Sequence, residues 1–184
     1  MEQIELAQDT DIAQLVSLIN EAYALSENEL WVDGWHFMRT CDADIMRMVK
    51  AQQIWVIRAN STDITACVST EALDEDLMEF GYLCVRSEHK RKGLASKLIS
   101  HSVDVAASRG HTTLQCELLI PRDLDKHPHI FKQMMLKDFY PKQGFEEVRR
   151  VPFEKAYPEV VARNKLAFEC DAVIFQMSLA LRKL

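Results

Sequence analysis

The stretch from residue 77 to residue 120 constrains the fold more than any other part of the chain. It opens with an apolar run, 77–85, that is typical of a strand, and a basic turn ending at Gly93 follows. After Gly93, apolar side chains recur at helical spacing: Leu94, Leu98, Ile99, Val103 and Ala106. Residues 112–120 predict another strand. A strand, a helix and a second strand in this order favour a parallel crossover within one sheet.

The remaining segments predict antiparallel pairing beside that crossover. Residues 64–70 and 77–85 flank the acidic turn 74–76, which indicates a hairpin. Further strands are expected near Ile4 and Leu6 and at 54–58, 145–151 and 172–181, and further helices at 12–23, 42–51 and 130–139. Asp9, Thr10 and Asp11 should cap the first helix. The expected class is therefore α/β with a mixed sheet, in the order β-α-α-β-β-β-α-β-α-β-β.

Length, charge and cysteine usage exclude several classes. The 184 residues, 48% of them hydrophobic, fit one domain over 1–184. A net charge of −6 gives no general attraction to phosphate or anionic lipid, so neither a nucleic-acid partner nor a membrane is expected. The N-terminus does not resemble a signal peptide, and the five widely spaced cysteines include no CxxC pair. These features predict a cytoplasmic protein with reduced thiols, among which Cys67, Cys84 and Cys116 are expected in the core.

The turn between the strand at 77–85 and the following helix has the chemistry of an anion site. Lys90, Arg91 and Lys92 concentrate positive charge on an otherwise acidic chain, and Gly93 lets the backbone approach a ligand closely. Unpaired N–H groups at a helix start bind phosphate groups. The turn lacks the Gly-Lys-Ser/Thr of an ATP-binding loop and the three glycines of a dinucleotide turn. A solvated basic turn and, with His89, a nucleic-acid contact are the alternatives.

Two motifs resemble those of the GNAT superfamily, the acetyl-CoA-dependent N-acetyltransferases. The segment 90–95, Lys-Arg-Lys-Gly-Leu-Ala, matches the Gln/Arg-x-x-Gly-x-Gly/Ala motif except that Lys90 replaces Gln or Arg. The segment 139–146, Phe-Tyr-Pro-Lys-Gln-Gly-Phe-Glu, resembles the late Tyr…Gly-Phe signature, although the usual preceding Asn is missing. The element order also agrees. The resemblance implies a mixed sheet of about seven strands flanked by about four helices.

The resemblance also implies a set of cofactor-binding residues. Backbone groups of Leu83, Cys84 and Val85 would contact the acetyl and pantetheine groups of acetyl-CoA. The pyrophosphate would be bound by the turn and the helix start, that is, by Lys90, Arg91, Lys92, Gly93, Leu94, Ala95 and Ser96. No metal is implied.

Two side chains are candidates for proton transfer. Tyr140 occupies the position of the family's general acid, and its phenol can protonate a departing thiolate. Pro141 is expected to push Tyr140 out of the helical region. Glu79, fourteen residues before Gly93, occupies the position of the strand glutamate that acts as a base in histone-type members. Without a bulge at Gly81, Glu79 would share a strand face with Leu83 and Val85. Packing and solvation are the alternative roles, and Glu117 is a weaker candidate for the base.

Other chemistry-bearing residues leave choices open. His127 and His129 form too small a set for a convincing metal site. Trp31, Trp35 and Phe37 either pack in the core or line an acceptor pocket in which Glu27, Glu29 or Asp33 attracts a cationic amine.

These observations predict an N-acetyltransferase that transfers the acetyl group directly from acetyl-CoA to an amine in a ternary complex. The acceptor would be a primary amine of a small molecule or of a protein, and a homodimer is possible. Cys84 leaves a covalent ping-pong route formally open. The alternative function is a GNAT-fold sensor that binds CoA without catalysis.

Overall fold

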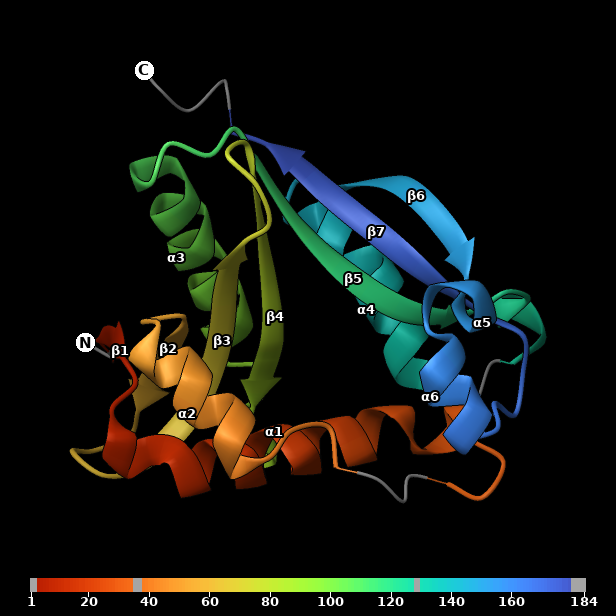
Figure 1. The fold of residues 1–184 in the computed structure, drawn as a ribbon, viewed down its shortest axis with the longest axis horizontal. Helices are drawn as coiled ribbons and strands as arrows, with labels where there is room; N and C mark the ends of the chain where they lie inside the picture. Colours follow the sequence, from red (N-terminus) through yellow and green to blue (C-terminus); the bar gives the residue numbers. More distant parts are fainter. Residues whose placement is uncertain (1–2, 35–37, 128–129, 180–184) are drawn as a thin grey trace. The chain divides into compact units, whose positions relative to one another are not determined.

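The protein was analysed as a computed structural model that describes residues 3–34, 38–127 and 130–179 (Figure 1). The chain divides into two compact units. Unit 1 comprises residues 1–22, 38–114 and 178–184, and unit 2 comprises residues 23–37 and 115–177. In the described ranges, no helix has the length and apolar character needed to cross a membrane.

Unit 1 contains the predicted hairpin and the predicted crossover helix. Three antiparallel pairings join its strands: β1 pairs with β2, β2 with β3, and β3 with β4. The elements are β1 (Ile4–Leu6), α1 (Ile12–Glu27, whose last turn belongs to unit 2), α2 (Asp42–Lys50), β2 (Ile54–Arg58), β3 (Ile64–Ala72), β4 (Leu77–Val85) and α3 (Leu94–Ser108). Each lies close to its predicted position.

Unit 2 contains two helices that the sequence pattern did not predict. The elements are β5 (Thr113–Pro121, which begins in unit 1), α4 (Phe131–Lys142), β6 (Glu146–Pro152), α5 (Phe153–Ala156), α6 (Pro158–Arg163) and β7 (Cys170–Ser178). The short helices α5 and α6 replace a segment expected to be irregular, so the described residues form six α-helices rather than about four. The seven strands form a mixed sheet in the order β1-β2-β3-β4-β5-β7-β6. The predicted α/β class is confirmed.

Buried apolar side chains from both faces of the sheet form the core of unit 1. Helix α3 contacts β3 and β4, and the Trp55 ring meets the His101 ring edge-on with 4.3 Å between centroids. Cys67 and Cys84 in unit 1 and Cys116 in unit 2 are all buried and form no disulfide, which confirms their expected place in the core.

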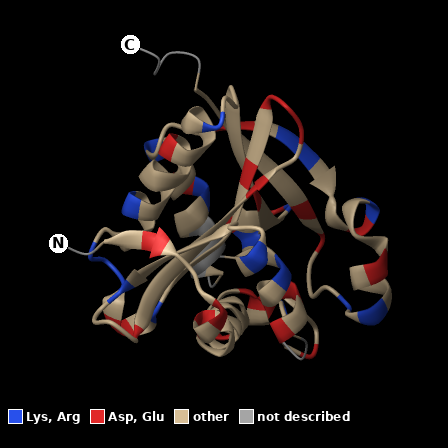
Figure 2. Cartoon of the chain, turned by 60° about the vertical axis from the view of Figure 1, so that its left-hand side comes forward, with Lys and Arg blue, Asp and Glu red and all other residues tan. Residues whose placement is uncertain are grey.

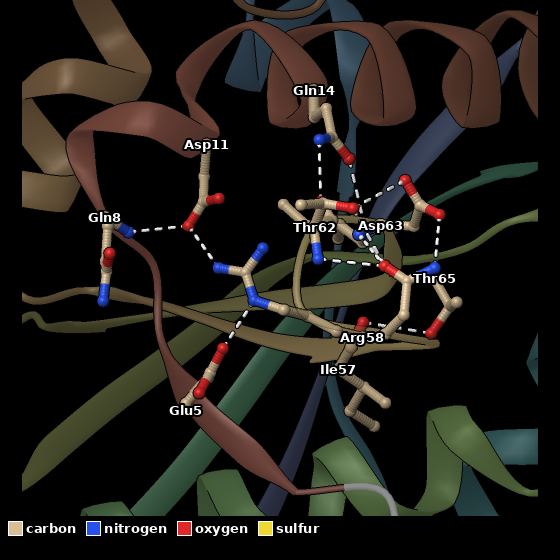
Figure 3. Close-up of polar contacts among 11 residues, drawn as sticks. Glu5, Gln8, Asp11, Gln14, Ile57, Arg58, Thr62, Asp63 and Thr65 are labelled. Atoms are coloured by element: carbon tan, nitrogen blue, oxygen red, sulfur yellow. Dashed lines mark hydrogen bonds and ion pairs between the residues drawn. The ribbon is translucent and has the colours of Figure 1, made fainter.

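A partly buried cluster of ion pairs links β1, the segment Asp9–Asp11 just before α1, and β2 (Figure 3). The guanidinium of Arg58 contacts the carboxylates of Glu5 and Asp11, the latter at 2.6 Å. Asp11 also accepts a hydrogen bond from the backbone N–H of Gln8 at 2.8 Å. These two carboxylates raise the pKa of Arg58. Asp11 therefore does more than cap a helix: it neutralises a cation inside unit 1.

Replacing Asp11 by alanine should destabilise the fold by about 3 kcal/mol, because the substitution leaves the Arg58 charge buried with only partial compensation. Glu5→Gln is the matched control, since its side chain is 42% exposed and its contribution should stay below about 1 kcal/mol. Urea unfolding measures both values. Equal losses of unfolding free energy in Asp11→Ala and Glu5→Gln would show that the buried carboxylate of Asp11 has no special role in compensating the Arg58 charge.

Candidate active site

Strand β4 carries a bulge at Tyr82 and Leu83. Ser69 pairs with Gly81, and Cys67 pairs with Cys84, so two residues of β4 lie opposite one residue of β3. Tyr82 adopts a φ of +43°, which is unusual for a bulky side chain. The backbone ladder between β3 and β4 is therefore interrupted at the centre of the segment predicted to bind the thioester.

The bulge changes which side chains share a face of β4. Residues directly opposite each other in antiparallel strands point to the same side, and Ser69 and Cys67 lie two positions apart on β3. Gly81 and Cys84 consequently share one face, and Glu79 belongs to that face as well. The condition under which Glu79 would share a face with Leu83 and Val85, a strand without a bulge, is therefore not met.

Gly81 itself has a packing role beside the bulge. A Cβ at this position would lie 3.2 Å from Ser69 Oγ, which is tighter than an ordinary contact. Opposite Glu79, the register places Glu71 of β3. Glu79 is half-buried and Glu71 is exposed, so the two carboxylates offer a matched pair of positions for testing a base.

The chain leaves β4 through an anchored residue and then enters the basic turn. The backbone N–H of Arg86 donates to the Thr65 carbonyl at 2.8 Å, and its Nε donates to the Ile64 carbonyl at 2.7 Å. Arg91 and Gly93 both have positive φ, +64° and +80°. A Cβ on Gly93 would have no atom within 4 Å, so open space lies in front of this glycine. The turn thus combines a left-handed backbone with unobstructed access.

Gly93 caps α3 without a side-chain hydrogen bond, which leaves the helix start available to a ligand. The N–H of Lys97 is the first to bond back to the Gly93 carbonyl, at 3.0 Å. The N–H groups before it have no partner within the helix. Lys90, Arg91 and Lys92 are exposed, Ala95 and Ser96 are half-buried, and the Leu94 side chain lies in the core. Any contact of Leu94 with an anion would therefore be made by its backbone.

Basic and acidic residues are mixed along the described part of the chain that Figure 2 draws. In the view of Figure 2, Lys and Arg are interspersed with Asp and Glu along helices and strands. The cations of the turn are consequently a local feature of an acidic chain with a net charge of −6.

In unit 2, Tyr140 is held by aromatic neighbours. Its ring centroid lies 5.5 Å from that of Phe139, 6.1 Å from that of Phe145 and 5.6 Å from that of Phe175, and the residue is 6% exposed. The expectation that Pro141 pushes Tyr140 out of the helix is wrong, because α4 continues to Lys142 with the proline inside it. Pro141 lies in the last turn, where a missing N–H disturbs little of the helix that follows.

Glu117, the weaker candidate for the base, already has a hydrogen-bonding partner in unit 2. The phenol of Tyr157 donates to Glu117 Oε1 at 2.6 Å. The Tyr157 ring packs on Phe153 with 4.9 Å between centroids, and Phe153 meets Trp31 edge-on at 6.2 Å. Tyr157 was not singled out from the sequence, because only the fold of 153–163 brings it to β5.

The aromatic and histidine candidates of unit 2 differ in burial and in whether the structure describes them. Trp31 is buried, which fits packing, while Trp35 and Phe37 lie outside the described residues. Glu27 is half-buried, and Glu29 and Asp33 are exposed. His127 packs against Phe168 with 4.0 Å between ring centroids, and His129 is also outside the described residues. No group of three or more potential metal ligands occurs in the part of the chain that the structure describes.

A family model for the acetyltransferase (GNAT) domain matches residues 50–147, which is more than half of the chain. The chain belongs to the GNAT acetyltransferases. The matched region includes the bulged β4, the basic turn, α3 and the Tyr140 segment. No curated protein matches the sequence.

Solved structures with low sequence identity share the GNAT fold of this acetyltransferase. An aminoglycoside 6'-N-acetyltransferase in complex with CoA has a TM-score of 0.68 at 13% identity, with 96% of this chain and 97% of that chain covered. YncA from Salmonella typhimurium, solved with acetyl-CoA, has a TM-score of 0.65 at 17% identity, with 97% and 94% covered.

A third neighbour is a much longer protein. N-acetylglutamate synthase from Neisseria gonorrhoeae, complexed with CoA and N-acetyl-glutamate, has a TM-score of 0.64 at 15% identity. The match covers 97% of this GNAT chain but only 35% of that one, so the chain spans about a third of the synthase.

Gly93→Val should remove the stabilisation that acetyl-CoA gives to this GNAT protein, because the new side chain would occupy the open space in front of the turn. In the wild type, ligand at ~100 times its Kd should add roughly 2.7 kcal/mol to the free energy of unfolding. Thermal melts with and without acetyl-CoA measure the difference.

Gly110→Val is the matched control for this substitution. Gly110 also has a positive φ, +90°, and a Cβ added there would likewise meet open space, but it follows the opposite end of α3. Both variants should therefore suffer similar backbone strain, and only Gly110→Val should retain the response to acetyl-CoA. A normal response in Gly93→Val would remove the turn from the binding site.

Proposed function

We propose that this protein is an N-acetyltransferase that moves an acetyl group from acetyl-CoA to a primary amine by direct transfer in a ternary complex, within one GNAT domain spanning 1–184. The observation that carries the proposal is the continuous segment of bulged β4, left-handed basic turn and open α3 N-terminus in a chain of the GNAT family. The aminoglycoside acetyltransferase and the synthase among its neighbours suggest the class of acceptor.

The turn and the helix start supply the binding of the CoA pyrophosphate in this proposal. Backbone N–H groups of Gly93, Leu94, Ala95 and Ser96 donate to the phosphate oxygens, and the α3 dipole favours the negative charge. Lys90, Arg91 and Lys92 add exposed positive charge around the same position.

Acetyl-CoA supplies an activated thioester, and strand β4 supplies the groups that act on it. Backbone groups at Leu83, Cys84 and Val85 hold the acetyl and pantetheine groups. The bulge interrupts the pairing with β3 at Leu83, while Cys84 and Val85 keep their partners on β3. An N–H group fixed in this way can stabilise negative charge that develops on the thioester oxygen. Glu79 takes the proton from the acceptor ammonium, which has no lone pair until it is deprotonated.

The departing thiolate needs a proton, which we assign to Tyr140. Three aromatic rings fix the Tyr140 ring, so its phenol is oriented before the substrate binds. Glu117 is less suited to be the base, since its carboxylate already accepts the Tyr157 phenol.

Two of the buried thiols, those of Cys67 and Cys170, are poorly suited to a covalent ping-pong route. Burial raises the pKa of Cys170 to about 12, and Cys84 together with burial raises the pKa of Cys67 well above its usual range. Such thiols are poor nucleophiles at neutral pH. A cytoplasmic location and a homodimer stay predictions, for cell fractionation and light scattering to measure.

A screen of primary amines with acetyl-CoA tests the proposed function. The panel should include amino acids, aminoglycosides, aliphatic amines and peptides with free N-termini or lysines. We expect at least one amine to release CoA thiol and to yield an equal amount of acetylated product. Binding of acetyl-CoA without thiol release from any amine would instead support a non-catalytic CoA sensor.

A further inference from the structure

Two cysteines lie directly opposite each other beside the β4 bulge. Cys67 of β3 pairs with Cys84 of β4 in the antiparallel register. Residues opposed in this way have Cα atoms roughly 4.5–5.5 Å apart. This separation falls within the range of about 4.4–6.8 Å that disulfides span. Both residues belong to unit 1, and both are buried, at 0% and 3% exposure.

The two thiols interact with each other and with the bulge. The Cys84 thiol opposite and burial together raise the pKa of Cys67 well above its usual range. The Cys67 thiol donates to the Tyr82 carbonyl, with 3.4 Å between sulfur and oxygen. The cysteine pair is thus connected to the residue whose left-handed backbone forms the bulge.

We propose that Cys67 and Cys84 form a reversible disulfide when the protein meets a peroxide, and that the oxidised form binds acetyl-CoA more weakly. With hydrogen peroxide, one thiolate attacks a peroxide oxygen, breaks the O–O bond and becomes a sulfenic acid as water is released. The second thiol attacks that sulfur, the S–S bond forms, and a second water leaves. Two thiols lose two electrons in total, and one peroxide is reduced to two waters.

Cys84 is the thiol that reacts first in this sequence. The Cys67 thiol donates its proton to the Tyr82 carbonyl, which disfavours this side chain as the first nucleophile. Cys67 then acts as the resolving thiol. Burial makes both steps slow and restricts them to small oxidants.

The disulfide would act on the acetyl-CoA site through the bulge. Oxidation removes the proton that Cys67 donates to the Tyr82 carbonyl, and the S–S bond holds β3 and β4 together at the residue that follows Leu83. The backbone groups assigned to the thioester are then reoriented. This half of the proposal rests on the proposed function, whereas formation of the disulfide does not.

By thermodynamic linkage, the disulfide and bound acetyl-CoA must oppose each other reciprocally. If the disulfide lowers the affinity for acetyl-CoA, bound acetyl-CoA must oppose the disulfide by the same factor, and coupled sites typically differ by about 5–150-fold. A tenfold coupling corresponds to about 30 mV in the reduction potential of the pair.

The test compares reduced and peroxide-treated wild-type protein. Peptide mass spectrometry after alkylation locates any disulfide, and calorimetry measures acetyl-CoA affinity before oxidation, after oxidation and after reduction by dithiothreitol. Cys67→Ala removes one partner and also its hydrogen bond to the Tyr82 carbonyl, so the affinity of this variant is compared with its own value before and after peroxide treatment. Cys170→Ala is the control, because Cys170 is equally buried but lies in unit 2.

We expect a Cys67–Cys84 linkage, an affinity at least fivefold lower that recovers on reduction, and no such loss in Cys67→Ala. Cys170→Ala should behave as the wild type. The proposal is overturned if mass spectrometry finds no Cys67–Cys84 disulfide after peroxide treatment. It is also overturned if the disulfide forms and the affinity for acetyl-CoA does not change. If the reduced protein does not bind acetyl-CoA, the proposed function fails together with the regulatory effect, while the mapped disulfide still decides the chemical half.

Discussion

Glu79→Gln should lower turnover on the order of 10²–10⁴-fold at neutral pH, which is the range for loss of a general base. The loss should shrink at high pH, because the acceptor amine, with a reference pKa near ~10.4, is increasingly deprotonated without help. A pH–rate profile of the variant and the wild type, measured with an acceptor from the amine screen, gives the loss of turnover at neutral pH and at high pH.

Glu71→Gln is the matched control for this prediction. Glu71 lies directly opposite Glu79 on β3 and carries the same charge, so it reproduces the local change in electrostatics without removing the proposed base. Its turnover should remain close to that of the wild type. If Glu79→Gln keeps the wild-type profile, the role passes to water or to Glu117, and Glu117→Gln separates those two.

Tyr140→Phe should lower turnover by about 10²-fold, or roughly 2.7 kcal/mol of transition-state stabilisation. The substitution keeps the ring among Phe139, Phe145 and Phe175 and deletes only the hydroxyl, so stability and acetyl-CoA affinity should change little. The effect should appear in kcat more than in KM, since the proton is needed only as the C–S bond breaks.

Two further variants show whether the hydroxyl itself is responsible. Tyr157→Phe also removes a phenol from unit 2, one that hydrogen-bonds to Glu117, and should not reproduce the loss in kcat. Pro141→Glu should be nearly silent, because α4 already runs through this position to Lys142. Wild-type turnover in Tyr140→Phe would assign the proton transfer to water or to another group.

The elements that the sequence predicted well are those whose signals are local. The apolar spacing after Gly93 defines α3, and the acidic turn at 74–76 separates β3 from β4. Gly93, expected from the sequence to leave room for a ligand beside the turn, has open space in front of it in the structure. Each of these depends on residues within one or two turns of chain, where propensity and periodicity are informative.

The features that the sequence did not predict depend on pairing between distant segments. Gly81 suggested a bulge, but only the register against β3 places it at Tyr82 and Leu83 and moves Glu79 to the face of Cys84. The buried partnership of Asp11 with Arg58 joins residues 47 positions apart. The contact between Tyr157 and Glu117 spans 40 positions in the same way. No window of sequence contains such information.

Hydrogen exchange with and without acetyl-CoA tests most directly the claim that the bulged β4, the basic turn and the start of α3 form the cofactor site. The account predicts that saturating acetyl-CoA slows exchange of the backbone amides at 82–85 and at 91–96, and that Gly110→Val retains this protection while Gly93→Val loses it. Protection confined to other segments, or none at saturating ligand, would contradict the account.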